Sequence, residues 1–300
     1  MLKVLIIGCG DLGGEVARQL AQLGIKTAGV RRSKAVIAGV EIIAADVTQP
    51  TSLQALVALQ PEILIYCVAA NGQSDEQYRT HYVDGFRHVL ATQAQNPRLR
   101  HVFFVSSTRV YGQNTATLLD ENIVAIPADF GGARLLEAEA LLNTLPCNST
   151  ALRLSGIYGA GRLRMINLAK SPEKWPLQNS WSNRIHSDDA AAFIVFLVQR
   201  VFAKKIAEEP IAACYIVTDS KPTSQYEVLS WIADKLQVTI PADMRTNMQA
   251  AMQALNQTPS QAGKRLSNKA MLATGFSLQY PDFQIGYQAL LAATMPDQAA

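Results

Sequence analysis

The glycine-rich segment near the N-terminus constrains the fold more than any other feature of the sequence. Residues 2 to 7 are apolar except for Lys3 and are predicted to form a buried strand, and Gly8, Gly10 and Gly13 follow at GxGxxG spacing. In a strand-turn-helix unit, such glycines permit a tight turn, the approach of backbone to a pyrophosphate, and close helix packing. Apolar residues then recur at helical spacing from Val16 onward. The segment therefore predicts a dinucleotide-binding fold with the phosphates at the helix N-terminus, and the alternative is an ordinary strand-turn-helix that contains glycines.

The residues after the next two predicted strands bear on which dinucleotide would bind. Arg31 and Arg32 follow a strand at 26 to 30, where an NAD-binding fold usually has a carboxylate about 20 residues beyond the glycines. A guanidinium matches a 2′-phosphate, which a carboxylate would repel, so the pair favours NADP over NAD. Asp46 and Val47 are expected near the adenine. The alternatives are two solvated surface arginines and, for Asp46, a cap for a nearby helix.

Composition limits the classes of partner. The chain has 300 residues, 49% of them hydrophobic, and a net charge of +3 with no basic run, so a small-molecule substrate is expected and nucleic acid is not. The longest apolar run, residues 190 to 198, is much shorter than the roughly 20 residues of a membrane span. The four cysteines are scattered along the chain and predict buried free thiols in a reducing compartment. The four histidines are scattered as well, so no metal site is expected. We expect a cytoplasmic location.

Strands and helices are expected to alternate along the first half of the chain. This alternation predicts an α/β, Rossmann-type doubly wound parallel sheet with a small C-terminal substrate region. Residues 1–158 are expected to form the NAD(P)-binding domain, to which segments of about 183–218 return, and 159–300 mainly the substrate side. The expected strands are 41–44, 63–67, 101–106, 150–154, 183–185 and 214–217, and the expected helices are 52–59, 76–95, 135–145, 190–199, 224–236 and 283–293. Residues 247–263 remain open between loop and helix.

Residues just after the strands are the functional candidates, because ligands of such sheets bind at the carboxyl ends of the strands. The expected cofactor-binding residues are Gly8, Gly10, Asp11, Leu12, Gly13, Arg31, Arg32, Asp46, Val47, Ala69, Ala70 and Asn71. His186 and the pair Asp188 and Asp189 are interpreted first as a scaffold residue and a helix cap.

Three motifs resemble those of the extended short-chain dehydrogenase/reductases, the NAD-dependent epimerase/dehydratase family, along most of the chain. They are Val-Ser-Ser-Thr-Arg-Val-Tyr-Gly at 105–112, Arg-Leu-Ser-Gly-Ile-Tyr-Gly at 153–159 and Arg-Ile-His-Ser-Asp-Asp at 184–189. The resemblance implies that Ser107 orients a substrate oxygen. It also implies a homodimer formed through the helices at 76–95 and 135–145.

The chain departs from this family at the YxxxK element. Phe130 stands in place of the tyrosine and Arg134 in place of the lysine. A phenylalanine cannot exchange a proton, and general acid-base help is worth about 10²- to 10⁴-fold. Arg134 is still expected to hold the cofactor ribose. Tyr82 stands where the family usually has asparagine, and the glycines are spaced GxGxxG, where extended members usually have GxxGxxG.

Three hypotheses for the chemistry follow. In the first, the protein is an oxidoreductase, epimerase or dehydratase acting on a nucleotide-sugar or a small carbonyl or hydroxyl compound, and Tyr82 or Tyr158 supplies the proton. In the second, it binds NADP(H) without catalysis, as a sensor or regulatory protein. In the third, the cofactor is structural and the reaction is a different one.

Overall fold

A seven-stranded sheet in the order β11-β7-β5-β4-β1-β2-β3 dominates the computed structural model, which describes residues 1–33, 35–203, 210–257 and 263–294. β1 pairs in parallel with β2 and β4, and the β2–β3 and β4–β5 ladders are parallel too. The order runs outward from β1 in both directions, so the predicted doubly wound α/β fold is confirmed. The strands are β1 (Val4–Ile7), β2 (Thr27–Arg31), β3 (Val40–Ala44), β4 (Ile63–Tyr66), β5 (His101–Ser107), β7 (Asn148–Leu154) and β11 (Cys214–Val217).

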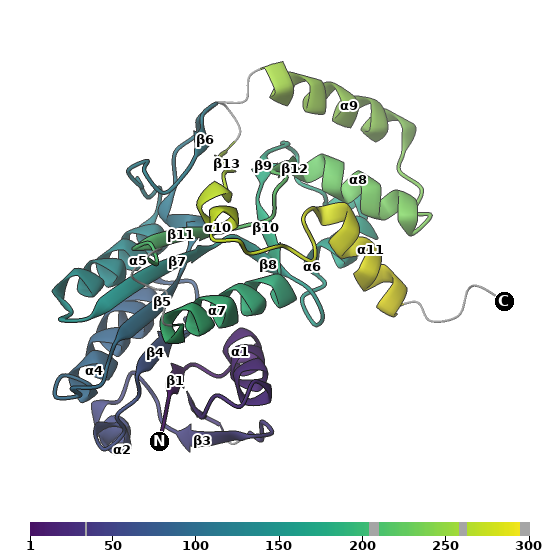
Figure 1. The fold of residues 1–300 in the computed structure, drawn as a ribbon. Helices are drawn as coiled ribbons and strands as arrows, with labels where there is room; N and C mark the ends of the chain where they lie inside the picture. The colour runs from purple at the N-terminus through teal and green to yellow at the C-terminus, as the bar shows by residue number, and fades with distance from the viewer. Residues whose placement is uncertain (34, 204–209, 258–262, 295–300) are drawn as a thin grey trace. The chain divides into compact units, whose positions relative to one another are not determined.

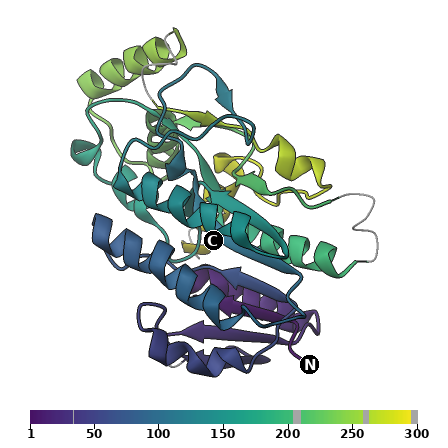
Figure 2. The ribbon, with the colours of Figure 1, turned by 90° about the vertical axis from the view of Figure 1, so that its left-hand side faces the viewer.

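The central strands are buried because helices cover both faces of the sheet. Every residue of β1 and β4 is buried, as expected for the continuous apolar runs of a parallel sheet. Figures 1 and 2 show α1 (Asp11–Gln22) and α7 (Ser187–Phe202) on one face, and α4 (Gly85–Thr92) and α5 (Phe130–Ala140) on the other. The loops at the carboxyl ends of the strands carry the candidate site.

Several helix boundaries differ from the sequence prediction. The expected helix 76–95 is instead α3 (Asp75–Tyr78), a π-helical segment (Arg79–Asp84) and α4. The expected helix 135–145 begins earlier, at Phe130, because the Asp129 carboxylate accepts a hydrogen bond from the Gly132 N–H at 2.9 Å and caps the first turn. The expected helix 52–59 is a 3₁₀ turn (Pro50–Leu53) followed by the short α2 (Gln54–Val57).

The chain divides into two compact units, called here the first and the second unit. The first contains residues 1–111, 126–153 and 190–215, and the second contains 112–125, 154–189 and 216–300. The sequence prediction placed 112–125, 154–158 and 183–189 with the first unit. They group with the second because β6 (Leu118–Leu119) pairs with β13 (Arg265–Leu266), and β8 (Gly156–Tyr158) pairs with β10 (Arg184–His186).

The second unit has an apolar core of its own. Trp175, Tyr226, Ile232 and Phe283 are among its buried members. The polar stretch that the sequence left open is helical as far as Gln257, and residues 258–262 lie outside the described residues. The other elements are α6 (Arg164–Ala169), β9 (Trp181–Ser182), β12 (Thr223–Ser224), α8 (Gln225–Lys235), α9 (Ala242–Gln257), α10 (Lys269–Ala273) and α11 (Phe283–Thr294).

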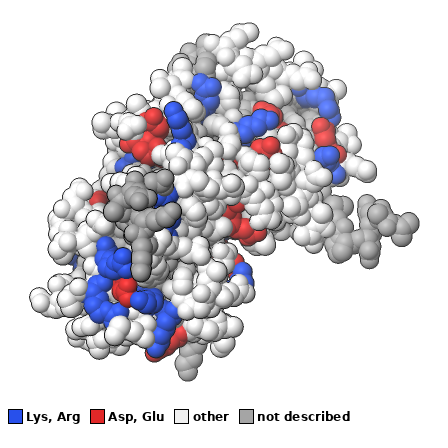
Figure 3. Space-filling model, viewed as in Figure 1, with Lys and Arg blue, Asp and Glu red and all other residues white. Residues whose placement is uncertain are grey.

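The surface shown in Figure 3 carries basic and acidic side chains intermixed. In the part of the chain that the structure describes, no helix combines the length and the apolar content that crossing a membrane requires.

Candidate functional site

The glycine loop after β1 is shaped by close packing at two glycines and by open space at the third. Gly8 has a φ of +97°, and a Cβ there would lie 2.4 Å from the Cys67 carbonyl oxygen. A Cβ on Gly13 would lie 2.3 Å from the Gly8 carbonyl oxygen, whereas a Cβ on Gly10 would meet nothing within 4 Å. Gly10 is the N-cap of α1 and supplies no side chain to its amides. The loop therefore leaves room at the helix N-terminus for a pyrophosphate.

Three segments after β2, β3 and β4 meet beside this loop. The exposed Arg32 donates from Nη2 to Asn71 Oδ1 at 2.8 Å, and its charge also acts on Asp46. Burial raises the pKa of Asp46, but hydrogen bonds from Thr48 and nearby positive charge outweigh burial and lower it overall. Arg31 donates to Ser33 Oγ at 3.0 Å. The structure thus brings the predicted residues Arg32, Asp46 and Asn71 together.

Asp46 does not cap the helical turn that follows it. Its carboxylate accepts from the N–H and Oγ of Thr48, at 2.9 and 2.8 Å, and the turn beginning at Pro50 has Gln49 as its N-cap. The neighbouring Val47 is buried, and its carbonyl oxygen lies 2.9 Å from His88 Nδ1. Ala69 is exposed.

Ser107 ends β5, and its side chain begins a local turn. Ser107 Oγ accepts from the backbone N–H of Arg109 at 3.2 Å. Phe130 is the first residue of α5, and its ring meets the Tyr78 ring edge-on, with centroids 5.5 Å apart. The guanidinium of Arg109 lies over both rings, 5.2 Å from the Phe130 centroid and 4.9 Å from that of Tyr78. Sequence reasoning missed Arg109 and Tyr78, and the signal that could have found them is the Gly131-Gly132 pair described below.

Tyr82 lies in the π-helical segment, a kind of irregularity that is frequent at functional sites. Its ring is tilted against Tyr78 with centroids 5.1 Å apart. Burial raises the pKa of the Tyr82 phenol, and a hydrogen bond with the Ala70 backbone opposes that effect. Tyr82 is therefore next to the Phe130 cluster, with its hydroxyl engaged by the main chain.

Arg134 is held by two carboxylates. It donates from Nε and Nη2 to Asp75 at 2.7 and 2.9 Å, and from Nη1 to Glu137 at 2.7 Å. These hydrogen bonds raise the pKa of Arg134, and the bond to Asp75 has the largest effect. Asp75 begins α3, so the arginine joins α3 to α5. Its role toward a cofactor ribose stays a prediction.

Tyr158 belongs to the second unit, where its ring packs edge-on against His186 and 4.5 Å from that of Tyr287. A Cβ on Gly286 would lie 1.9 Å from the Tyr158 hydroxyl oxygen, which has no hydrogen-bond partner among the described residues. Burial raises the pKa of this phenol.

Asp188 and Asp189 were expected to cap a helix from 190, but α7 begins at Ser187, so both lie inside its first turn and Asp189 has a different role. It is buried, and it accepts hydrogen bonds from the backbone N–H groups of Gln279 and Tyr280, at 2.8 and 2.9 Å. His186 Nδ1 accepts from the Asp188 N–H at 3.2 Å, in keeping with its interpretation as a scaffold residue.

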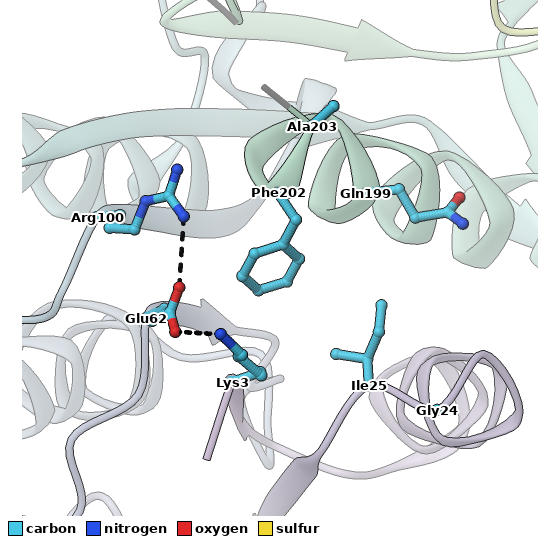
Figure 4. Close-up of a pocket in the computed structure, with 8 residues that line it drawn as sticks. All are labelled: Lys3, Gly24, Ile25, Glu62, Arg100, Gln199, Phe202 and Ala203. Atoms are coloured by element: carbon cyan, nitrogen blue, oxygen red, sulfur yellow. Dashed lines mark hydrogen bonds and ion pairs between the residues drawn. The ribbon is translucent and has the colours of Figure 1, made fainter. Parts of the chain in front are cut away.

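A separate cavity of about 560 Å³ lies in the first unit (Figure 4). Beside it, Glu62 pairs with Lys3, Arg98 and Arg100 at 2.5, 3.0 and 3.3 Å. Lys3 and Glu62 precede β1 and β4, so this network is at the amino ends of the strands. Ligands of such sheets bind at the carboxyl ends, and we therefore assign the network a structural role. The cavity is lined by Lys3, Gly24, Ile25, Glu62, Arg100, Gln199, Phe202 and Ala203.

The cysteines differ from the sequence expectation in burial. All four are free thiols, but Cys9 alone is buried, and Cys67, Cys147 and Cys214 are half-buried. Burial raises the pKa of Cys9 to about 11. Across the described ranges, no group of three or more His, Cys, Asp or Glu side chains is arranged to hold a metal ion.

Comparison with known proteins adds family information to this geometry. The model of the NAD dependent epimerase/dehydratase family matches residues 4–209. A Methylobacillus flagellatus structure, provisionally described as an NAD-dependent epimerase/dehydratase, is 46% identical over 98% of each chain, with a TM-score of 0.82. A functionally unknown conserved protein from Silicibacter pomeroyi DSS is 23% identical over 98% of this chain and 99% of that chain (TM-score 0.69). UDP-glucose 4-epimerase from Thermus thermophilus, solved with NAD, is 16% identical over 95% of this chain and 96% of that chain (TM-score 0.71). No protein of curated function matches.

Proposed function

Because the chain belongs to the NAD-dependent epimerase/dehydratase family, we propose that it is an NADP(H)-binding oxidoreductase, epimerase or dehydratase. Its substrate in this proposal is a nucleotide-sugar or a small carbonyl or hydroxyl compound. The observation that carries the proposal is the glycine loop, in which Gly8 and Gly13 are fixed by packing while Gly10 faces open space at the start of α1. A cofactor with a pyrophosphate fits such a helix N-terminus.

The residues around this loop fit the rest of the cofactor. Asp46 and Val47, together with residues 69–71, would hold the adenosine end. Arg31 and Arg32 donate to the neutral oxygens of Ser33 and Asn71, and a 2′-phosphate would be a stronger acceptor for both guanidinium groups. This difference supports NADP over NAD. When bound, the cofactor supplies or accepts a hydride, and Ser107 would orient the substrate oxygen.

A non-catalytic NADP(H) sensor is the second candidate. Phe130 favours it, because the family's tyrosine supplies a proton that phenylalanine lacks. Arg134 favours it as well, because Asp75 and Glu137 engage the guanidinium that stands in place of the family's lysine.

Thermal unfolding with added nucleotide tests the cofactor proposal. A ligand at 100 times its dissociation constant stabilises the folded state by about 2.7 kcal/mol. We expect NADPH and NADP to raise the Tm, NADH and NAD to act weakly, and Arg31→Ala/Arg32→Ala to abolish the difference. Arg79→Ala/Arg87→Ala is the matched control, because both arginines are exposed and face Asp84. The absence of a shift with all four nucleotides would contradict the proposal.

Turnover separates the enzyme from the sensor. Oxidation of NADPH in the presence of a panel of aldehydes, quinones and keto sugars supports the enzyme. If NADPH raises the Tm and no panel compound is reduced, but Phe130→Tyr/Arg134→Lys creates turnover, the sensor is favoured.

The helices α3, α4 and α5 are also our proposed homodimer surface. Asp75 and Arg134 join α3 to α5 within one chain, so the two helices can form one continuous face. Sedimentation velocity would show a dimer, and a monomer at micromolar concentration would contradict this part of the proposal.

A further inference from the structure

The first turn of α5 leaves a space beside Gly131 and Gly132, called here the Arg109 seat, that Arg109 occupies. A Cβ on Gly131 would lie 2.4 Å from Arg109 Cζ, and a Cβ on Gly132 would lie 2.6 Å from the Arg109 carbonyl oxygen. Any larger residue at either position would displace the arginine. Glycine also lowers helix stability by about 1 kcal/mol relative to alanine, so helix propensity does not explain two consecutive glycines. The pair is instead explained by the close approach of Arg109.

Asp129 fixes the guanidinium in this seat. Arg109 Nε lies 3.0 Å from both Asp129 oxygens, and Nη2 lies 3.0 Å from Oδ2. Burial lowers the pKa of Arg109, but the hydrogen bonds and charge interactions with Asp129 and Tyr78 together outweigh burial and raise it overall, so the group stays cationic. Asp129 also caps α5 through the Gly132 N–H, so the same carboxylate sets both the helix start and the position of the cation.

The fixed cation contacts one phenol. Arg109 Nη1 donates to the Tyr78 hydroxyl oxygen at 2.7 Å, and Gln73 Oε1 lies 3.3 Å from the same hydroxyl and accepts its proton. Tyr78 is 7% exposed, so its ring is held by packing. A guanidinium donor at this distance fixes the position of the phenol oxygen.

This phenol lies beside the position at which the family carries its tyrosine. The Tyr78 and Phe130 rings are 5.5 Å apart, and the backbone N–H of Arg109 donates to Ser107 Oγ. Among the described residues, neither of the other two tyrosines considered from the sequence has a hydroxyl that is hydrogen-bonded to an arginine. Tyr82 bonds to the Ala70 backbone, and the hydroxyl of Tyr158 packs against Gly286 in the second unit.

We propose that Tyr78 is the proton donor of this site and that Arg109 is its positioning residue, an inference that rests on the proposed NADP(H)-dependent reduction. The substrate class is a carbonyl compound. When bound, NADPH would supply the hydride to the carbonyl carbon. Tyr78 would give its phenolic proton to the carbonyl oxygen, which would replace Gln73 Oε1 as the acceptor, and the alcohol would be released. The phenolate then accepts from Arg109 until water restores the proton, so charge and atoms balance.

Site-resolved labelling with benzenesulfonyl fluoride tests this assignment without a known substrate. In this reaction the phenol oxygen bonds to sulfur, and fluoride and the phenolic proton leave. We expect peptide mass spectrometry to find Tyr78 labelled ahead of Tyr82 and Tyr158, with NADPH slowing the reaction. Arg109→Gln should slow Tyr78 labelling about tenfold, because a hydrogen bond to a charged group is lost, and Arg109→Lys should restore part of it.

Two further variants test whether labelling depends on where the Arg109 cation lies or only on the presence of a nearby positive charge. Gly131→Ala keeps Arg109 but moves its guanidinium, so it should slow Tyr78 labelling as Arg109→Gln does. Arg79→Gln removes a cation that neighbours Tyr78 in sequence but pairs with Asp84 at 3.6 Å, and it should leave labelling unchanged. Tyr78 labelling that is absent, or independent of both Arg109→Gln and Gly131→Ala, would overturn the inference.

A tyrosine swap provides the kinetic test. On any carbonyl that the wild type reduces, Tyr78→Phe should lower kcat about 10²- to 10⁴-fold with little change in the KM for NADPH. Adding Phe130→Tyr should restore part of the rate. A comparable loss in Tyr82→Phe, with none in Tyr78→Phe, overturns the assignment. A wild type that binds NADPH and reduces no carbonyl counts against a proton donor and for the sensor.

The two proposals fail in different measurements. Failure of the proposed function appears in the wild type as the absence of an NADPH-induced Tm shift. Failure of the Tyr78 assignment appears with that shift intact, as labelling or turnover that does not depend on Tyr78 and Arg109.

Discussion

Two clusters of buried polar side chains, one in each unit, differ in how completely their members are hydrogen-bonded. In the first unit, Arg153 pairs with Glu139 at 2.7 Å, and both side chains are nearly excluded from solvent. Glu139 also accepts from Ser106 Oγ at 2.6 Å, and Arg153 donates to the Tyr111 hydroxyl at 2.6 Å. These bonds join α5 to β5 and β7 just below Ser107. A buried network whose members are all bonded in this way stabilises one arrangement of its elements.

In the second unit, four buried side chains near one another each leave a polar atom without a partner among the described residues. They are Tyr158 Oη, Arg184 Nη1, His186 Nε2 and Asp219 Oδ2. Each of these residues is less than 5% exposed. Native proteins bond most buried polar groups, and internal water completes many sites of this kind. The comparison indicates that the Arg153 network holds a fixed geometry, whereas the cluster in the second unit retains unmet hydrogen-bonding capacity.

The largest expected effect comes from breaking the bonded network. Glu139→Gln leaves the Arg153 cation buried without its counter-charge, and we expect a loss of about 3–5 kcal/mol in the free energy of unfolding. Urea denaturation measures it. The control is Glu137→Gln, because Glu137 pairs with Arg134 at the surface and such pairs are worth about 0–1 kcal/mol. Equal effects in the two variants would remove the basis of the comparison.

The strands of the first unit were predicted within one or two residues because they carry short apolar or β-branched runs, a signal that is local in the sequence. The runs of β1 and β4 are buried on both faces. The helix starts were less predictable. Leu135 and Leu136 suggested a helix from 135, but the start at Phe130 depends on the Asp129 cap. The polar helix α9 was left open because it buries few apolar residues, among them Met248 and Leu255.

The parts of the candidate site that follow directly from local motifs were predictable from the sequence. The parts that depend on contacts between residues far apart in the sequence were not. The glycine loop and the residues after each strand follow from the alternation of strands and helices. The seat of Arg109 requires Gly131 and Asp129 to meet a residue some twenty positions earlier, and Tyr78 reaches it from another helix. Because these contacts join residues on separate elements, no local periodicity in the sequence predicts them.

The second expected effect concerns how the free energy of unfolding depends on pH through Asp219, a member of the cluster in the second unit. Burial raises the pKa of Asp219 from 3.8 to about 7, with Arg184 opposing and Asp282 and Asp189 adding to the shift. Tyr158 and Tyr287 face the same carboxyl group. The folded state holds this proton more tightly than the unfolded state. Stability should therefore fall as the pH rises from about 3.8 to about 7, and remain lower above pH 7.

Asp219→Asn removes this dependence. We expect the variant to be about 2–4 kcal/mol more stable than the wild type at pH 8 and similar to it near pH 4, by urea denaturation at both values. His101 in the first unit gives the opposite slope. Burial lowers its pKa from 6.5 to about 4, so its contribution to stability is complete above pH 6.5 and lost as the pH falls toward 4. A wild-type profile unchanged by Asp219→Asn would refute the assignment.

The smallest expected effect comes from a matched pair of tyrosines. Tyr111→Phe deletes a hydroxyl that accepts from the Arg153 cation at 2.6 Å, so we expect a loss of about 1.5–3 kcal/mol. Tyr158→Phe deletes a buried hydroxyl with no protein partner among the described residues, and we expect a change within about 0.5 kcal/mol or a small gain in stability. Both are measured by urea denaturation at pH 7.

The Tyr158→Phe result also discriminates between two states of the cluster. If the variant instead loses as much stability as Tyr111→Phe, the Tyr158 hydroxyl is bonded in solution, and internal water that joins it to Asp219 or Arg184 is the physical explanation. The cluster would then be as fully bonded as the Arg153 network, with water in the role that Glu139 has in that network. A near-zero effect leaves the contrast intact, because a hydroxyl that bonds to nothing contributes little when it is removed.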